Sequence, residues 1–291
     1  MKRVFPRSIP PPDERPHPER SEWPLDPHDF ATYYRYAPAA LAVRECLRLR
    51  AVRKYDLPEP IFDIGCGDGV FAALAYPGKQ IWGIDINADE VRRAQATSTY
   101  STLVCGSITE VSLPAGFFQS AVANCSLEHV PRLDLALSQI HRSLAPGAPF
   151  ILIVPTPGWT RLLAIPDLLT KAGLPALAAA YGNGLDSIFN HIHMYDPPEW
   201  RAQLEAAGFR VRSIETLTSR RSSWMFDILL YPSLVGLMNK KLTGKWVQVP
   251  LLRNLSVDVV RRTIDALAAL VPDSNEGSEY LIVCETPEAS G

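Results

Sequence analysis

Three glycines at alternate positions follow a strand-like apolar run in IFDIGCGDGVFA, residues 61–72. Glycine costs backbone entropy, so a cluster of it marks a place where the main chain must bend sharply or approach a ligand closely. A strand that ends in such a loop and opens a helix can cradle a nucleotide-like ligand. The dinucleotide pattern G-x-G-x-x-G is not met, because Val70 stands at its third glycine position. The loop therefore indicates a different cofactor.

Asp85 ends a second strand-like run, QIWGIDI, 20 residues after Gly65. A carboxylate at that position can accept hydrogen bonds from both hydroxyls of a ribose. The glycines alone could form a tight strand-to-helix turn, and Asp85 alone could cap a strand end. Both features at this spacing and in this order favour a cofactor site.

Histidines are the candidate catalytic bases. His191 and His193 lie two residues apart in FNHIHMYDPPEW, so on an extended stretch they face the same side. Glu128 and His129 follow a predicted fourth strand, at the sheet edge where ligands collect. His129, His191 and His193 could each accept a proton from an acceptor. Loop capping and an ordinary surface loop are the alternatives, and we expect no metal because no third ligand is evident beside His191 and His193.

Short apolar strands alternate with helices through the first half of the chain, which implies a parallel sheet covered on both faces. The predicted strands are 60–65, 80–86, 101–107, 119–126 and 149–157. In the second half, a helix and a strand are predicted within 197–217 and a last strand within 278–288. Residues 218–279 between them have helical character.

Together these motifs resemble the class I S-adenosylmethionine-dependent methyltransferases, in the type 11-like group that acts on small molecules. The family patterns D-x-G-C-G-x-G, L-E-H-V and L-x-P-G-G correspond to DIGCGDG at 63–69, SLEHV at 126–130 and LAPGAP at 144–149. The resemblance implies an α/β fold with a doubly wound, Rossmann-like seven-stranded sheet, its last strand antiparallel, and a helical insertion before that strand. It also implies S-adenosyl-L-methionine as cofactor.

The resemblance carries the cofactor site over residue by residue. The implied binding residues are Asp63, Gly65, Cys66, Gly67, Asp85, Ile86, Ser107, Ile108, Asn124 and Tyr36. Asp63 would lie near the methionine amino group and Asp85 at the ribose. The chain departs from the family where Ser107 replaces an acidic residue after the third strand, and where Gln119 replaces the usual aspartate before the fourth. Neither change removes a ribose or methionine contact, so we expect binding to persist.

The expected domain organisation has two parts. Residues 1–36 form a proline-rich arm or lid, whose prolines exclude a helix or a central strand. Residues 37–291 form the methyltransferase domain, with 156–200 and 218–279 as segments over the acceptor. The stretch 218–255 mixes basic and aromatic residues, as an interfacial segment or a lid over an apolar acceptor would. An ordinary helical cap with a basic rim is the alternative.

The composition of the chain limits the classes of partner and the compartment that can be expected. The net charge of −2 gives no global reason to bind nucleic acid. The five cysteines form no C-x-x-C pair, which suits a reducing cytoplasm. No apolar run approaches the ~20 residues that a transmembrane helix needs, although peripheral membrane contact stays open.

These observations predict an enzyme that methylates a small-molecule acceptor, with a hydroxyl oxygen of a natural product or other metabolite preferred. The alternatives are a lipophilic acceptor (quinone, isoprenoid or lipid) at a membrane surface, and a cofactor-binding protein without catalysis. The sequence leaves the oligomeric state open.

Overall fold

The computed structural model describes residues 22–243, 247, 253–272 and 274–288. In this part of the chain, seven strands form one sheet in the order β3-β2-β1-β4-β5-β7-β6. Their bounds are β1 Ile61–Ile64, β2 Ile81–Asp85, β3 Thr102–Cys105, β4 Ser120–Asn124, β5 Pro149–Pro155, β6 Arg210–Ser219 and β7 Gly277–Glu285. Strands β1 to β5 pair in parallel, and β7 runs antiparallel to both neighbours. The doubly wound, seven-stranded sheet with an antiparallel last strand is thus confirmed.

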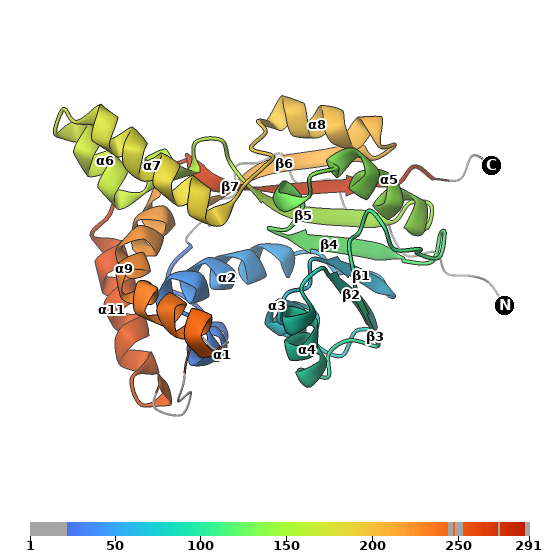
Figure 1. Ribbon diagram of the computed structural model, residues 1–291, viewed down its shortest axis with the longest axis horizontal. Coiled ribbons are helices and arrows are strands. Elements are labelled where there is room, and N and C mark those ends of the chain that lie inside the picture. The colour runs from blue at the N-terminus through green and yellow to red at the C-terminus, as the bar shows by residue number, and fades with distance from the viewer. Residues whose placement is uncertain (1–21, 244–246, 248–252, 273, 289–291) are drawn as a thin grey trace.

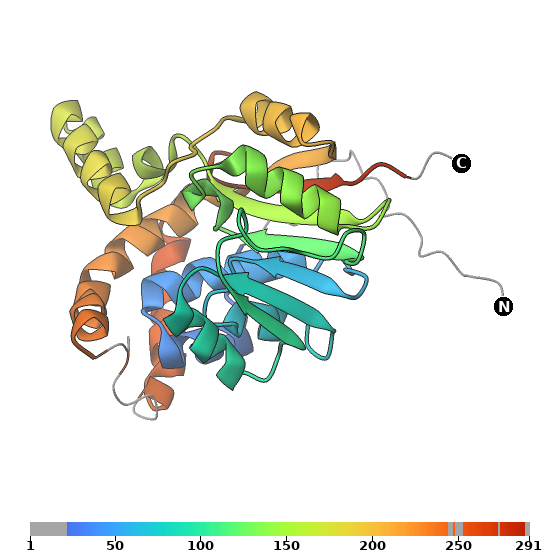
Figure 2. The same ribbon diagram turned by 45° about the vertical axis from the view of Figure 1, so that its right-hand side comes forward.

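Helices cover both faces of the sheet (Figures 1 and 2). Their bounds are α1 Pro27–Tyr36, α2 Ala39–Val52, α3 Val70–Ala75, α4 Ala88–Ala96, α5 Leu133–Ser143, α6 Ala164–Lys171, α7 Pro175–Phe189, α8 Pro197–Ala206, α9 Arg220–Thr243 and α11 Val257–Ala269. Two short 3-10 helices, η1 Leu127–His129 and η2 Trp159–Leu162, follow β4 and β5. Alternate strand residues face opposite cores, as the pleat requires. Ile61 belongs to the core with α1 to α3, and Phe62 to the core with α5 and α8.

Helix α1 corrects the expectation that the arm at 1–36 contains no helix. Pro27 is its first residue, where a missing N–H and a fixed φ favour a helix. The Asp26 carboxylate caps the helix by accepting the N–H of Asp29 at 2.9 Å. Proline is disfavoured in a helix interior but favoured at the first helical position, so a proline-rich segment can still begin a helix. Residues 1–21 of the arm lie outside the described residues.

A buried ion network holds α2 against the sheet. Arg44 donates to Glu279 Oε1 of β7 at 2.7 Å, and Arg48 donates to Glu45 Oε1 at 2.6 Å and to Glu279 Oε2 at 3.3 Å. Asn124, the last residue of β4, donates to the second oxygen of Glu45 at 2.9 Å. Although burial raises the pKa of Glu279, the guanidinium groups of Arg48 and Arg44 hold it at about 2. Pairing offsets the cost of burying these charges and fixes the position of α2 over β4 and β7.

The helical insertion before the last strand is confirmed, because α9 and α11 lie between β6 and β7. Helices α6 and α7 project beyond the sheet next to α9 (Figure 1). The buried carboxylate of Asp227 in α9 accepts the N–H of Ile165 in α6 at 2.9 Å and the hydroxyl of Tyr181 in α7. One side chain therefore ties three helices of this region together.

The basic residues at 218–255 largely serve the fold. Arg221 and Arg253 donate to main-chain carbonyls at 3.0 and 2.7 Å. Arg220 lies 3.7 Å from the carboxylate of Glu276. Of the aromatic side chains in this stretch, Phe226 is buried and Trp224 is half-buried. The side chains of Lys240, Lys241, Lys245 and Trp246 are not among those that the structure describes.

No helix among the described residues combines the length and the hydropathy that a bilayer crossing needs. The expected cytoplasmic location stays a prediction.

Candidate active site

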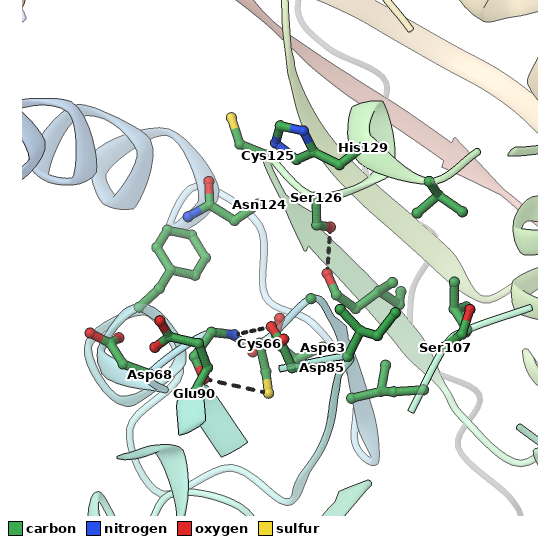
Figure 3. A pocket seen from close by; sticks show the side chains of 18 of the residues that line it. Asp63, Cys66, Asp68, Asp85, Glu90, Ser107, Asn124, Cys125, Ser126 and His129 are labelled. Carbon is green, nitrogen blue, oxygen red and sulfur yellow. Dashed lines mark hydrogen bonds between the residues drawn. The ribbon is translucent and has the colours of Figure 1, made fainter. Parts of the chain in front are cut away.

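A cavity of about 490 Å³ opens at the carboxyl ends of β1, β2 and β4 (Figure 3). The strand order reverses here, since β1 lies between β2 and β4, and open α/β sheets bind their ligands at such a switch point. Predicted residues that line the cavity are Asp63, Gly65, Cys66, Gly67, Asp85, Ile86, Ser107, Ile108, Asn124 and His129. The structure thus brings nearly all of the expected cofactor set to one place.

The first two loop glycines have different tasks. Both have positive φ, +74° at Gly65 and +53° at Gly67. A Cβ on Gly65 would lie 2.3 Å from the Cβ of Ser126, whereas a Cβ on Gly67 would meet no atom within 4 Å. Ser126 itself is fixed by donating to the carbonyl of Ile64 at 2.6 Å. Gly65 therefore lets the β1 and β4 loops pack together, and Gly67 leaves room for a ligand beside the main chain.

Asp85 is held in one orientation by the main chain. Its Oδ2 accepts the N–H of Gly67 at 2.9 Å, and its Oδ1 accepts the N–H of Asn87 at 2.8 Å. Each oxygen keeps a lone pair, and the side chain lines the cavity. The carboxylate is positioned to accept hydroxyl donors, as a ribose would require.

Two further polar side chains that line the cavity, those of Asp63 and Asn124, lack a full set of hydrogen-bond partners among the described residues. Asp63 is buried and accepts the hydroxyl of Tyr100 at 2.7 Å. Burial, together with the charge of Asp85, raises the pKa of Asp63 to about 7 despite that hydrogen bond. Asn124 Oδ1 is buried and has no partner among the described residues. A ligand with a cationic amino group and further donors suits this combination.

The part of the cavity formed by Ile86, Ser107 and Ile108 is more apolar. Ile108 is buried, whereas Ile86 is 75% exposed, and both line the cavity. The Ser107 hydroxyl lies 2.8 Å from that of Thr109 and accepts the Thr109 N–H at 3.3 Å. Ser107 is therefore already engaged locally, and Ile86 offers an uncovered apolar surface that a planar ring could use.

The N-terminal helices contribute cavity residues that the sequence analysis did not identify. Tyr36, expected to bind the cofactor, is half exposed and is absent from the cavity lining, whereas Tyr33 one turn earlier lines it. Leu41 and Glu45 of α2 line it as well. Tyr33 belongs to the same aromatic run as Tyr36, ATYYRY at 31–36, whereas nothing in the sequence marks Glu45, because a glutamate on an amphipathic helix is usually solvent-exposed.

A histidine cluster forms the other side of the site. Figure 3 shows His129 on the far side of Ser126 from Asp63 and Asp85. The His129 ring stacks on His191, with ring centroids 5.3 Å apart. The carbonyl of Glu128 accepts the N–H groups of Ile192 and His193 at 2.9 and 3.0 Å, which docks this loop onto η1. Two segments more than 60 residues apart thus meet here.

The hydrogen bonds of each ring decide which nitrogens are available. His129 Nδ1 lies 3.1 Å from the carbonyl of Asn190, and His191 Nδ1 lies 3.2 Å from Asp186 Oδ1. Since a carbonyl and a carboxylate only accept, both Nδ1 atoms donate, and in the neutral form of each ring Nε2 carries the lone pair. Burial also lowers the pKa of His191 and favours its neutral form.

His193 differs from the other two histidines. Its Nε2 lies 2.9 Å from the carbonyl of Val130, and its Nδ1 lies 2.9 Å from the hydroxyl of Tyr195. Both nitrogens are engaged, and the side chain is absent from the cavity lining. The geometry therefore suits His193 to holding the loop on η1.

Several known proteins that resemble this chain are methyltransferases, which agrees with the cofactor site described above. Residues 33–214 match a family model described as a methyltransferase domain. An uncharacterized methyltransferase of Mycobacterium tuberculosis is 33% identical over 90 residues, 30% of this chain and 46% of its own length. The chain thus spans about half the length of that relative. The ubiquinone/menaquinone biosynthesis C-methyltransferase UbiE of a Bradyrhizobium species is 28% identical over 183 residues, 57% of this chain and 71% of its own.

The fold also has solved counterparts. Phosphoethanolamine N-methyltransferase 2 of Haemonchus contortus, solved in complex with S-adenosyl-L-methionine, superposes with a TM-score of 0.52 at 14% identity. The superposition covers 92% of this chain and 59% of that one. The family match extends over more than half of the chain and coincides with the sheet order and the glycine loop described above. The protein therefore belongs to the class I S-adenosylmethionine-dependent methyltransferases.

Proposed function

We propose that the protein methylates a hydroxyl oxygen of a small-molecule metabolite. The observation that carries this proposal is His129, whose ring lines the cavity with the Nε2 lone pair available. A hydroxyl becomes a good nucleophile only as it loses its proton, and a positioned imidazole can accept that proton. His191, stacked on His129, is the second candidate base.

The cofactor would lie along the first half of the cavity. Asp85 would accept the ribose hydroxyls, Asp63 would face the amino group, and Ile86 and Ile108 would enclose the adenine. When bound, S-adenosyl-L-methionine supplies an electrophilic methyl group, and the electron pair of the broken carbon–sulfur bond stays on sulfur. The residues of this chain then have three tasks: to hold the two molecules in line, to exclude water and to accept the hydroxyl proton.

The segments 156–200 and 218–279 would enclose the acceptor. Helix α7 leads directly to the loop that carries His191, and its Phe189 ring stacks on that histidine at 5.8 Å between centroids. Phe226 of α9 packs against Phe189, 6.1 Å away. Aromatic side chains from both segments therefore continue the wall that begins at His129, which supports their assignment as a cap.

A turnover assay with S-adenosyl-L-methionine and matched hydroxyl, amine and carbon acceptors tests the proposal. The expected product carries the methyl group on oxygen, as read by mass spectrometry. His129→Ala should lower turnover about 100-fold, in the range of general-base effects, with cofactor affinity unchanged in calorimetry. Methylation of amines alone, or wild-type turnover in both His129→Ala and His191→Ala, would refute it.

A lipophilic acceptor is the second candidate. Large apolar side chains on the helices of the cap are exposed: Leu168, Leu174, Leu177, Ile188, Ile228 and Tyr231. The relative UbiE is named for C-methylation in ubiquinone and menaquinone biosynthesis. A prenylated hydroquinone in detergent micelles is the probe for this candidate. Methylation of its ring carbon in preference to any hydroxyl would establish it over the first.

A further inference from the structure

Glu128, His129 and His191 place three metal-ligating groups at one point of the cavity wall. One ligand atom from each lies within 4.8 Å of the other two. His129 Nε2 and Glu128 Oε1 are 3.7 Å apart. Two ligands about 2.1 Å from a tetrahedral zinc ion lie roughly 3.4 Å from each other, so this pair already has a suitable spacing. The ligand atoms are at most 4.8 Å apart, so a movement of roughly 1.4 Å or less at His191 would complete the set.

The protonation states also suit a cation. Both Nδ1 atoms donate to fixed acceptors, so Nε2 is the nitrogen that each neutral imidazole has free for a metal, and His129 Nε2 lies 3.7 Å from Glu128 Oε1. The acceptor for His191 is Asp186, which is itself fixed because its Oδ1 accepts the indole N–H of Trp159 at 2.7 Å. A carboxylate that orients a histidine through Nδ1 is the usual outer support of a metal-binding imidazole.

Glu128 is buried, and its surroundings compensate its carboxyl group only in part. Its side chain is 1% exposed, and Oε2 has no hydrogen-bond partner in the part of the chain that the structure describes. The two guanidinium groups that act electrostatically on the cluster, those of Arg44 and Arg48, are hydrogen bonded to Glu279 instead. A buried carboxyl oxygen in this position gains most from a cation.

We infer that Glu128, His129 and His191 form a binding site for a divalent transition-metal ion of the zinc type. Two imidazoles and one carboxylate favour such an ion over Mg²⁺ or Ca²⁺, which prefer oxygen ligands. His129 lines the cavity, so the open coordination positions face the acceptor. His193 is excluded as a ligand, since both of its nitrogens are engaged.

The role of this ion rests on the proposed function, although its binding does not. The proposed function gives His129 the task of removing a hydroxyl proton. A bound ion would occupy the Nε2 lone pair of His129 and take over this task by lowering the pKa of a hydroxyl that it contacts, so that the proton leaves to solvent. The ion would also fix the direction from which the acceptor oxygen approaches.

Calorimetric titration of the chelator-stripped full-length protein with Zn²⁺ tests the site. We expect one ion per chain, with affinity reduced at least tenfold in His191→Ala and in Glu128→Gln. Asp186→Asn should weaken binding about tenfold through the orientation of His191. His28→Ala, which removes an exposed histidine that does not line the cavity, is the matched control and should bind as the wild type does.

Co²⁺ gives a second readout that misfolding cannot imitate. The wild-type protein should show visible absorption bands from bound Co²⁺, and His191→Ala should lose them while its far-ultraviolet circular dichroism stays unchanged. Absence of saturable Zn²⁺ binding, or equal affinity in wild type, His191→Ala and Glu128→Gln, overturns the site.

The two proposals fail separately. Zinc binding without methylation of any hydroxyl acceptor keeps the metal site and rejects the proposed function. Full oxygen methylation in excess chelator keeps the function and rejects the role of the ion in it, whereas a stripped protein that methylates hydroxyls but binds no added Zn²⁺ rejects the metal site itself.

Discussion

The two ends of the cavity are built in different ways. At the end assigned to the methyl donor, residues 63–69 lie at the end of β1 and in the loop after it, and Asp85 ends the adjacent strand β2. The main chain itself fixes the geometry through the Gly67 N–H and positive φ angles. At the end assigned to the acceptor, His129 and His191 come from segments more than 60 residues apart and meet only because a loop docks on η1. The donor end is thus a local construction, and the acceptor end depends on tertiary packing. Substitutions should therefore act on separate steps.

The largest effect is expected at Gly65. Gly65→Ala places a Cβ 2.3 Å from Ser126 at a positive φ, which should cost about 2 to 5 kcal/mol of unfolding free energy and abolish cofactor binding. Gly67→Ala is the matched control, because its Cβ meets no protein atom. It should cost only about 1 to 2 kcal/mol from backbone strain, yet still block the cofactor. Urea unfolding and calorimetry measure both; equal stability of the two variants would contradict the distinction.

The next effect concerns Asp63 and pH. Its pKa in the fold, about 7, lies above the ordinary value, so folding takes up a proton between pH ~4 and ~7. The stability that Asp63 contributes is complete at low pH and is lost as the pH rises through 7. Asp63→Asn removes this loss and should make the cofactor-free protein more stable than wild type at pH 8, by up to roughly 4 kcal/mol.

Urea unfolding of both proteins at pH 5 and pH 8 provides the measurement. A stability difference between wild type and Asp63→Asn that does not change with pH would show that the carboxyl titrates normally. The same variant should bind S-adenosyl-L-methionine more weakly, because an amide cannot balance an ammonium group.

Asp85→Asn tests the donor end with a nearly isosteric side chain. The amide has one acceptor for two main-chain N–H groups, so one loop hydrogen bond is lost together with the charge, which should cost about 1.5 to 3 kcal/mol, or roughly 10- to 100-fold in cofactor affinity. Turnover at saturating cofactor should change little. A large fall in turnover with unchanged affinity would mean that the two ends are not separable.

His193→Phe tests the acceptor end, where turnover should change and cofactor affinity should not. The substitution removes two hydrogen bonds that hold the loop on η1, so unfolding free energy should fall by about 1 to 3 kcal/mol. Turnover should fall as His191 loses its position, while cofactor affinity stays within twofold. Wild-type turnover would show that the loop holds its place without this side chain.

The smallest effect is expected at Tyr36. Because Tyr33 rather than Tyr36 lines the cavity, Tyr36→Ala should leave cofactor affinity within twofold, and Tyr33→Ala should lower it. Calorimetry with both variants decides the matter. A loss of affinity in Tyr36→Ala would mean that α1 rearranges when the cofactor binds.

The contrast between a locally built donor end and an acceptor end that depends on tertiary packing also explains which parts of the site the sequence could predict. The glycine loop and Asp85 are separated by one strand and one helix, so spacing alone placed them together. Glu128 and His191 are not near one another in sequence, which is why no third ligand was evident beside the histidine pair. The ion pairs of the charged residues of α2 could not be predicted for the same reason, because the partner of Arg44 and Arg48 is Glu279, on the last strand. A helical pattern shows which residues share a face, but not what that face packs against.

The buried ion network has a consequence for how this cavity could change during evolution or redesign. Replacing Glu45, Arg48 or Glu279 singly would leave an unpaired charge away from water, so these positions should tolerate few single substitutions. Leu41 lies on the same helix wall and carries no charge, and Ala37 lies just before that helix. Glu45, Arg48 and Glu279 would therefore have to be replaced together, whereas Ala37 and Leu41 can be replaced one at a time. New acceptor specificities are most accessible through Ala37 and Leu41.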